Sequence, residues 1–354
     1  MDVVDSPSQA SPALPSRVDD HASDTADALS ALVGLLRSDL EACNRTIVAR
    51  MDSPVALIPQ LAAHIVAAGG KRLRPLLTLA SARLCGYPAD GVGARHVKLA
   101  ACVEFIHTAT LLHDDVVDES LLRRGLASAN AVFGNQASVL VGDFLFARAF
   151  QLMVEDGSLV VLAILSRAAA TIAEGEVLQL ATQNDLSTPE ARYLAVIKGK
   201  TAALFAAACE VGAVVANQPN RDAAALADYG LNLGIAFQLV DDALDYAADQ
   251  AVLGKTVGDD FREGKITLPV LVAYQAGDPD DRAFWRRTIE ASEQTEADLD
   301  RALDLMARCG AIGATLERAA GFAGAAKAAL AVFPDCALRR ALMDVADYTV
   351  SRAR

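Results

Sequence analysis

Apolar residues follow a helical spacing along almost the whole chain, from about Ala26 to the last residues. Long segments of alanine, leucine and valine alternate with short stretches rich in glycine, proline, asparagine and aspartate, which favour turns. Four such stretches are clear, at residues 86–88, 156–158, 217–220 and 277–279. The sequence has neither an alternating strand pattern nor a tandem repeat of fixed period. The pattern therefore predicts one all-α domain, a helical bundle over residues 26–354.

The first 25 residues lack this spacing. They carry Pro7, Pro12 and Pro15 among serines and aspartates, a composition that favours disorder. We predict a disordered N-terminal tail over residues 1–25, which resembles neither a secretory signal nor an arginine-rich transit peptide. The six cysteines form no CxxC pair, and most lie among apolar helical residues. Reduced core thiols are therefore expected, and with them a cytoplasmic protein.

The composition excludes several classes of partner. Of the 354 residues, 53% are hydrophobic, which is enough for a large core. The net charge of -13 repels nucleic acid and anionic membranes. We expect no transmembrane segment, because Arg167 and Glu210 interrupt the two most apolar runs before they reach the ~20 residues that a span needs. An anionic substrate would require a local basic pocket or bound metal cations.

Two copies of the sequence DDxxD lie within apolar helical segments. Positions i and i+4 of a helix share a face, so Asp114 projects with Asp118, and Asp241 projects with Asp245. Crowded carboxylates repel one another unless a cation neutralises them. Hard oxygen ligands suit Mg²⁺, which usually takes its remaining ligands from water and substrate phosphates. The two motifs predict carboxylate clusters that face a shared cavity and hold a diphosphate through magnesium.

A single DDxxD is more often a solvated, acidic helix face than a metal site. Two copies inside apolar helices are harder to explain in that way, because buried aspartates without a partner are very unfavourable. Basic residues beside glycine support the metal interpretation, since they offer close backbone approach and charge-assisted donors to a diphosphate. They occur at Lys71, Arg72 and Arg74, at Arg123 and Arg124, at an expected helix break at Lys198 and Lys200, and at Lys255 and Lys265.

These stretches together resemble the trans-isoprenyl diphosphate synthase, or polyprenyl synthetase, family over nearly all of residues 27–354. The resemblance rests on GGKRLRP, EFIHTATLLHDDVVDESLLRRG, GNQASVLVGDFLFARAF, KGKTAALF, GIAFQLVDDALDY and GKTVGDDFREGKITLP, in the family's order. The stretch EFIHTATLLHDDVVDES is most similar to long-chain synthases, which make octaprenyl to decaprenyl tails for quinones. The resemblance implies a helical bundle of the isoprenoid synthase type around a central cavity, a prenyltransferase activity and a homodimer.

The resemblance also implies individual roles. Asp114 and Asp118, supported by Asp115, would bind magnesium on an allylic diphosphate such as farnesyl or geranylgeranyl diphosphate. A further magnesium would be held by Asp241, with Asp242 and Asp245 nearby. Contacts to the allylic diphosphate would come from Arg123, Lys200, Lys255 and Lys265, helped by Thr201 and Gln238. Isopentenyl diphosphate would be bound by Lys71, Arg74, His107 and Arg124.

Product length is predicted from the helix that carries the first motif. Ala109, Ile106 and Cys102 precede Asp114 by five, eight and twelve residues, and at ~100° per residue they form one stripe. A tail anchored at Asp114 would run along this stripe and pass the small Ala109, where a bulky aromatic would end the tunnel. The alternative is that Ala109 is only a close helix–helix contact.

Two other classes of protein remain open at this point. A class I terpene cyclase also uses an aspartate-rich helix, but its second metal motif follows an Asn/Ser/Glu pattern. It also has no need of a second diphosphate site such as the one around Lys71 and Arg74. A non-catalytic partner subunit would tend to lose aspartates, and here all six are present. Product chromatography after incubation with farnesyl and isopentenyl diphosphates and Mg²⁺ distinguishes the three.

Overall fold

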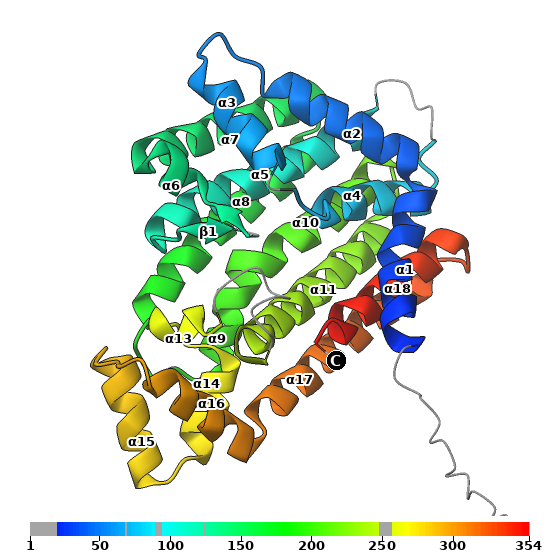
Figure 1. The fold of residues 1–354 in the computed structure, drawn as a ribbon. Coiled ribbons are helices and arrows are strands. Elements are labelled where there is room, and N and C mark those ends of the chain that lie inside the picture. The colour runs from blue at the N-terminus through cyan, green and yellow to red at the C-terminus, as the bar shows by residue number, and fades with distance from the viewer. Residues whose placement is uncertain (1–19, 68, 89–93, 124, 248–256, 354) are drawn as a thin grey trace, which may run out of the picture.

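The computed structural model describes residues 20–67, 69–88, 94–123, 125–247 and 257–353. Helices form nearly all of this part of the chain and pack into one bundle (Figure 1). The first half contains α1 (Asp20–Leu35), α2 (Arg37–Arg50), α3 (Leu57–Ala67), α4 (Leu73–Leu84), α5 (Arg95–Val117), α6 (Ala129–Phe133), α7 (Asn135–Asp156) and α8 (Leu159–Thr182). The second half contains α9 (Glu190–Ile197), the π-helix η1 (Lys198–Ala202), α10 (Ala203–Val215), α11 (Asn220–Ala247), α13 (Asp259–Arg262), α14 (Leu268–Ala276), α15 (Pro279–Trp285), the π-helix η2 (Arg286–Glu290), α16 (Asp298–Cys309), α17 (Ala311–Ala329), the 3₁₀ helix η3 (Leu330–Val332) and α18 (Ala337–Ser351).

All four turn stretches that the sequence marks fall between helices, and their residues explain the helix ends. Gly157 ends α7 in the left-handed conformation, with φ 76°, which glycine adopts without strain. Ser158 then begins α8 by accepting a hydrogen bond from the backbone N–H of Val161. Asp278 begins α15 in the same way, with Asp281 as the donor at 2.9 Å.

Three local features differ from the sequence prediction. α1 begins at Asp20, before the expected start near Ala26, and residues 1–19 of the predicted tail lie outside the described residues. A two-stranded antiparallel ribbon, β1 (Leu122–Arg123) and β2 (Leu126–Ala127), follows the first aspartate motif. The expected break at Lys198 is absent, because α9 continues through η1 into α10 with helical backbone throughout.

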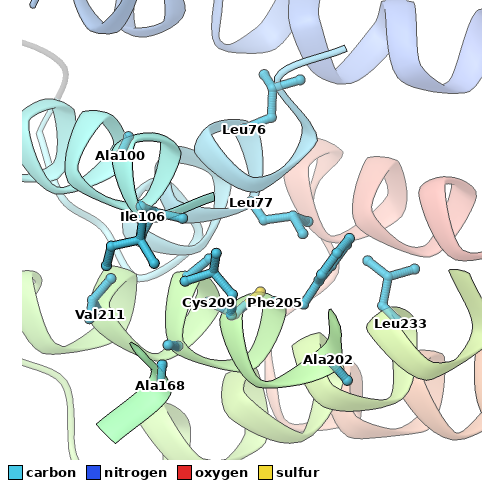
Figure 2. Packing of buried hydrophobic residues seen from close by; sticks show 14 of the residues in the cluster. Leu76, Leu77, Ala100, Ile106, Ala168, Ala202, Phe205, Cys209, Val211 and Leu233 are labelled. Atoms are coloured by element: carbon cyan, nitrogen blue, oxygen red, sulfur yellow. The ribbon is translucent and has the colours of Figure 1, made fainter. Parts of the chain in front are cut away.

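Helices α5, α10 and α11 form the centre of the bundle (Figure 1). α5 packs against α4 and α7, α10 against α4 and α8, and α11 against α10 and α17. Figure 2 shows the interior between these elements, where Ile106 of α5 points towards Val211 of α10 and Phe205 lies near Leu77. All six cysteines are free thiols, four of them buried, as the sequence predicted.

Two described helices, α7 and α11, are long and apolar enough to cross a membrane by length and composition. The sequence prediction did not identify them. Such a signal is weak, because core helices of globular proteins also pass this test. α11 runs through the bundle and carries the second aspartate motif, so its apolar residues serve the core. α7 is less buried, and its outer face carries the exposed side chains of Leu140, Phe150 and Val154.

Candidate active site

Both aspartate motifs lie near the C-terminal ends of central helices. Asp114 and Asp115 belong to the last turn of α5, and Asp118 caps that helix, with its N–H donating to the carbonyl of Asp114 at 2.8 Å. Asp241 and Asp245 lie near the end of α11. Both helices run through the core, where α5 is buried on every side from Leu99 to Ile106, and the aspartates follow at the helix ends.

Lys200 of η1, which packs against α8, lies close to the first motif. Its Nζ donates to Glu176 Oε2 at 2.8 Å and lies 3.9 Å from Asp114 Oδ2. Burial raises the pKa of Asp114, the nearby Lys200 counteracts this, and the neighbouring Asp118 raises the pKa further. Ionisation of Asp114 therefore has a free-energy cost, which a bound cation would offset.

Lys265 connects the two motifs. Its Nζ donates to Asp118 Oδ2 at 3.0 Å, pairs with Glu263 and lies 3.9 Å from Asp260 Oδ1. The backbone N–H of Asp260 in turn donates to Asp245 Oδ2 at 3.1 Å. Burial opposes the charge of Lys265, but Asp260, Asp118 and Glu263 together raise its pKa. Lys265 contacts the first motif directly, and it is connected to the second motif only through Asp260.

Asp242 belongs to a buried hydrogen-bond network. Its Oδ2 accepts from the hydroxyl of Tyr193 at 2.6 Å, and its Oδ1 accepts from Gln238 Nε2 at 2.8 Å. The other end of the Gln238 amide accepts from Thr201 Oγ1 at 2.7 Å, which ties α11 to η1. Burial, followed by the charge of Asp260, raises the pKa of Asp242 to about 7. This network, with Asp242 at its centre, fixes the position of the second motif relative to η1.

Of the residues predicted for isopentenyl diphosphate, Arg74 of α4 and His107 of α5 contact one another. Arg74 Nη1 donates to His107 Nε2 at 2.9 Å, and its guanidinium stacks 4.5 Å from the centroid of Phe205. Lys71 Nζ donates to the hydroxyl of Tyr348 at 2.5 Å. Of the predicted substrate contacts, Arg124 and Lys255 lie outside the described residues.

Arg123 is held by the first motif itself. Its Nε lies 2.8 and 2.9 Å from the two oxygens of Asp115, and its Nη2 lies 2.5 Å from Oδ1. The side chain of Asp115 is only 2% exposed, and its backbone carbonyl accepts from Asn130 Nδ2 at 2.9 Å. Asp115 therefore anchors β1 to the end of α5, in addition to any role in binding substrate.

The three residues predicted to line the path of the growing tail lie in the protein interior. Ala109, Ile106 and Cys102 are all fully buried, and Cys102 Sγ donates to the carbonyl of Ala149 on α7 at 3.3 Å. This position fits both an apolar path for a tail and a close helix contact, so their role in chain length stays a prediction.

Several residues of the site belong to none of the sequence motifs. Glu176 is a carboxylate on a largely apolar helix, and that contrast is the only signal that could have identified it. Arg352 Nη2 donates to Asp241 Oδ1 at 2.9 Å, and Tyr348 contacts Lys71, so α18 reaches both halves of the site. The spacing of α18 offers no hint of this, because the partners lie 277 residues away for Tyr348 and 111 residues away for Arg352.

The donor set fits magnesium. Among the described residues, no three His, Cys, Asp or Glu side chains lie close enough to hold a metal ion by themselves. Mg²⁺ does not need such a cage, since it keeps several waters and is usually bound by one or two carboxylates with substrate phosphates. Asp114 and Asp118, each already facing a cation of the protein, are carboxylates of this kind.

An all-helical bundle whose carboxylates and lysines meet in one site is suited to a metal ion and an anionic ligand. The sequence matches a known family over residues 55–306, and the chain belongs to that family, the polyprenyl synthetases. It is therefore a prenyltransferase.

Individual relatives agree over most of their length. The chain is 49% identical to the octaprenyl diphosphate synthase of Escherichia coli K12 over 320 residues, which cover 90% of this chain and 98% of that protein. Its fold matches a polyprenyl synthase from Caulobacter crescentus CB15, complexed with calcium and isoprenyl diphosphate, with a TM-score of 0.88, 57% identity and coverage of 92% and 98%. A decaprenyl diphosphate synthase from Rhodobacter capsulatus matches with a TM-score of 0.87, 54% identity and coverage of 92% and 99%.

Proposed function

We propose that this chain lengthens an allylic diphosphate with isopentenyl diphosphate, in the presence of Mg²⁺, to a long all-trans product that serves as a quinone side chain. Farnesyl or geranylgeranyl diphosphate is the proposed primer, and octaprenyl or decaprenyl diphosphate the proposed product. The names of the relatives support a long product, since one is an octaprenyl and another a decaprenyl diphosphate synthase.

The observation that carries the proposal is the double pairing of the first motif. Lys200 lies beside Asp114 and Lys265 beside Asp118, and Lys265 also approaches the residues around Asp245. A diphosphate needs donors of this kind, and magnesium needs the carboxylates. Arg74 and His107 form a separate basic pair that suits a second diphosphate.

The mechanism follows from these positions. Magnesium held by Asp114 and Asp118 would supply Lewis-acid stabilisation of the diphosphate leaving group. Lys200 and Lys265 add fixed positive charge where the leaving group gains negative charge, which favours cleavage of the carbon–oxygen bond, so that the diphosphate departs and the allylic carbocation remains. Arg74 and His107 hold isopentenyl diphosphate so that its double bond can attack that carbon and form the new carbon–carbon bond. The cation formed on the isopentenyl unit then loses a proton to the departed diphosphate, which creates the new double bond, and the apolar interior excludes water that would quench the cation.

A homodimer in the cytoplasm is part of the same proposal. The support is the outer face of α7, where Leu140, Phe150 and Val154 remain exposed on one stripe. An exposed apolar stripe of this kind is typical of a protein–protein contact. Sedimentation velocity of the purified protein would give its mass directly.

Product analysis tests the activity. The purified protein is incubated with farnesyl diphosphate and labelled isopentenyl diphosphate, with Mg²⁺ or with a chelator, and the products are measured by mass spectrometry. We expect octaprenyl or decaprenyl diphosphate only with Mg²⁺. A cyclic terpene from farnesyl diphosphate alone would indicate a cyclase, and no turnover without a second protein would indicate a partner subunit.

A further inference from the structure

Helix α8 and η1 cross at two glycines. A Cβ on Gly175 would lie 2.5 Å from the backbone nitrogen of Lys200, and a Cβ on Gly199 would lie 2.9 Å from the Cα of Gly175. The two backbones are therefore in direct contact, at a distance that only glycine permits. This contact fixes the residue after each glycine, and those residues are Glu176 and Lys200.

The local backbone also directs Lys200 towards the site. Lys198–Ala202 forms a π-helix between α9 and α10, and π-helical turns are frequent at functional sites. Thr201, the next residue, is bound to Gln238 of α11. Lys200 is thus held on both sides, by α8 through Gly175 and by α11 through its neighbour.

Glu176 and Asp114 share the ammonium group of Lys200 unequally. The distance from Nζ is 2.8 Å to Glu176 and 3.9 Å to Asp114, so Glu176 makes the hydrogen bond and Asp114 makes the looser contact. Both Lys200 and Glu176 are about three quarters buried, which strengthens their attraction. Without Glu176, the nearest acceptor for this ammonium group would be Asp114.

Stability alone does not account for Glu176. Its second oxygen, Oε1, is buried and makes no hydrogen bond among the described residues. A buried, half-paired carboxylate is an unfavourable element of a core. Its presence beside the reaction centre therefore indicates a role in the site.

We infer that Glu176 is a positioning residue, which holds Lys200 ready for the allylic diphosphate and keeps it from closing onto Asp114. This inference rests on the proposed function. It predicts that loss of Glu176 weakens two things at once: cation binding at Asp114, which would then compete with Lys200, and the contact from Lys200 to the allylic diphosphate.

The test compares Glu176→Gln and Glu176→Ala with Glu174→Gln, a matched control on the exposed face of the same helix. Two quantities are measured: the KM for each substrate, and the affinity for Mn²⁺ by calorimetry in the presence of an unreactive allylic thiolodiphosphate. We expect Glu176→Ala to weaken Mn²⁺ binding and raise the allylic KM by roughly tenfold each, corresponding to ~1.4 kcal/mol, while the KM for isopentenyl diphosphate stays unchanged. Glu176→Gln, which keeps the size and one acceptor, should lie between Glu176→Ala and the wild type.

The same substitution in a Lys200→Met background separates positioning from direct metal binding. If Glu176 acts through Lys200, Glu176→Ala changes Mn²⁺ affinity no further in that background. A change that persists there, or Glu176 variants that behave like Glu174→Gln, would overturn the inference. Failure of the proposed function would look different, because the wild type itself would then neither bind the thiolodiphosphate nor form a product.

Discussion

The ion pair between Arg123 and Asp115 allows a quantitative test of how the first motif is built. Arg123→Ala removes the partner of a carboxylate whose side chain is 2% exposed, while Arg123 itself is 26% exposed. Removing one partner of a fully buried ion pair typically lowers the free energy of unfolding by ~3–5 kcal/mol. Water can reach part of the guanidinium, so we expect a loss of about 2–3 kcal/mol, below the fully buried range.

That loss corresponds to a modest shift in melting temperature. At ~2.1 cal/mol/K per residue, unfolding of a chain this long has an entropy of about 0.7 kcal/mol/K, so Tm should fall by about 3–4 °C. Scanning calorimetry without metal or substrate measures this shift. Arg340→Ala is the control, because its pair with Asp335 is more than half exposed, and such pairs contribute ~0–1 kcal/mol.

A double-mutant cycle completes the test. Asp115→Asn removes the charge but keeps the shape, and the double variant with Arg123→Ala should be less destabilised than the two single losses added together. Equal melting temperatures for Arg123→Ala and Arg340→Ala, with no coupling in the cycle, would refute the reasoning. Arg123 would then be free to serve the substrate alone.

Four further outcomes follow from the site. Asp114→Asn should leave a folded protein whose turnover falls at least about a hundredfold; near-normal turnover would contradict the metal assignment. Arg74→Ala should raise mainly the KM for isopentenyl diphosphate and Lys200→Ala mainly that for the allylic substrate, by roughly ten- to hundredfold each, and equal effects on one substrate would rule out two separate sites. Ala109→Phe should shorten the product while early condensations stay efficient, as chain-length analysis with one primer will show; an unchanged length in an active variant would place the tail elsewhere. Burial lowers the pKa of His96, so as the pH falls through about 6.5 the histidine of the unfolded chain is protonated before that of the folded protein. The free energy of unfolding of the wild type should therefore fall more steeply below that pH than that of His96→Gln, as urea titrations at several pH values will show.

Local patterns in the sequence predicted the fold and much of the site. Helical spacing, turn residues and the two DDxxD motifs each depend on neighbours within one or two helical turns, and the helices, the family and its prenyltransferase activity are confirmed. The strands of β1 and β2 are too short to show a period of two. The segment at Lys198 was expected to break because it contains glycine, but Gly199 serves the contact with α8.

The remaining residues could not be predicted, because their contacts exist only in three dimensions. Glu176 meets Lys200 through a helix crossing, and Arg352 meets Asp241 because α18 packs back onto the bundle. Neither residue has a neighbour in the sequence that indicates its partner. The individual roles of the site residues, and the path of the growing tail, stay predictions.

Because lysines pair with the first aspartate motif, a ligand that binds there must replace part of these lysine–aspartate contacts. A divalent cation at Asp114 and Asp118 would replace Lys200 and Lys265 as the charge partners of these aspartates, and each lysine would keep its other acidic neighbours, Glu176 for Lys200 and Glu263 for Lys265. The cation alone would leave the ammonium groups with fewer acidic partners, and the diphosphate alone would compete with the aspartates for them, whereas both ligands together give every charged group a partner. Magnesium and the allylic substrate should therefore bind cooperatively, and thermodynamic linkage requires each to increase the affinity for the other by the same factor.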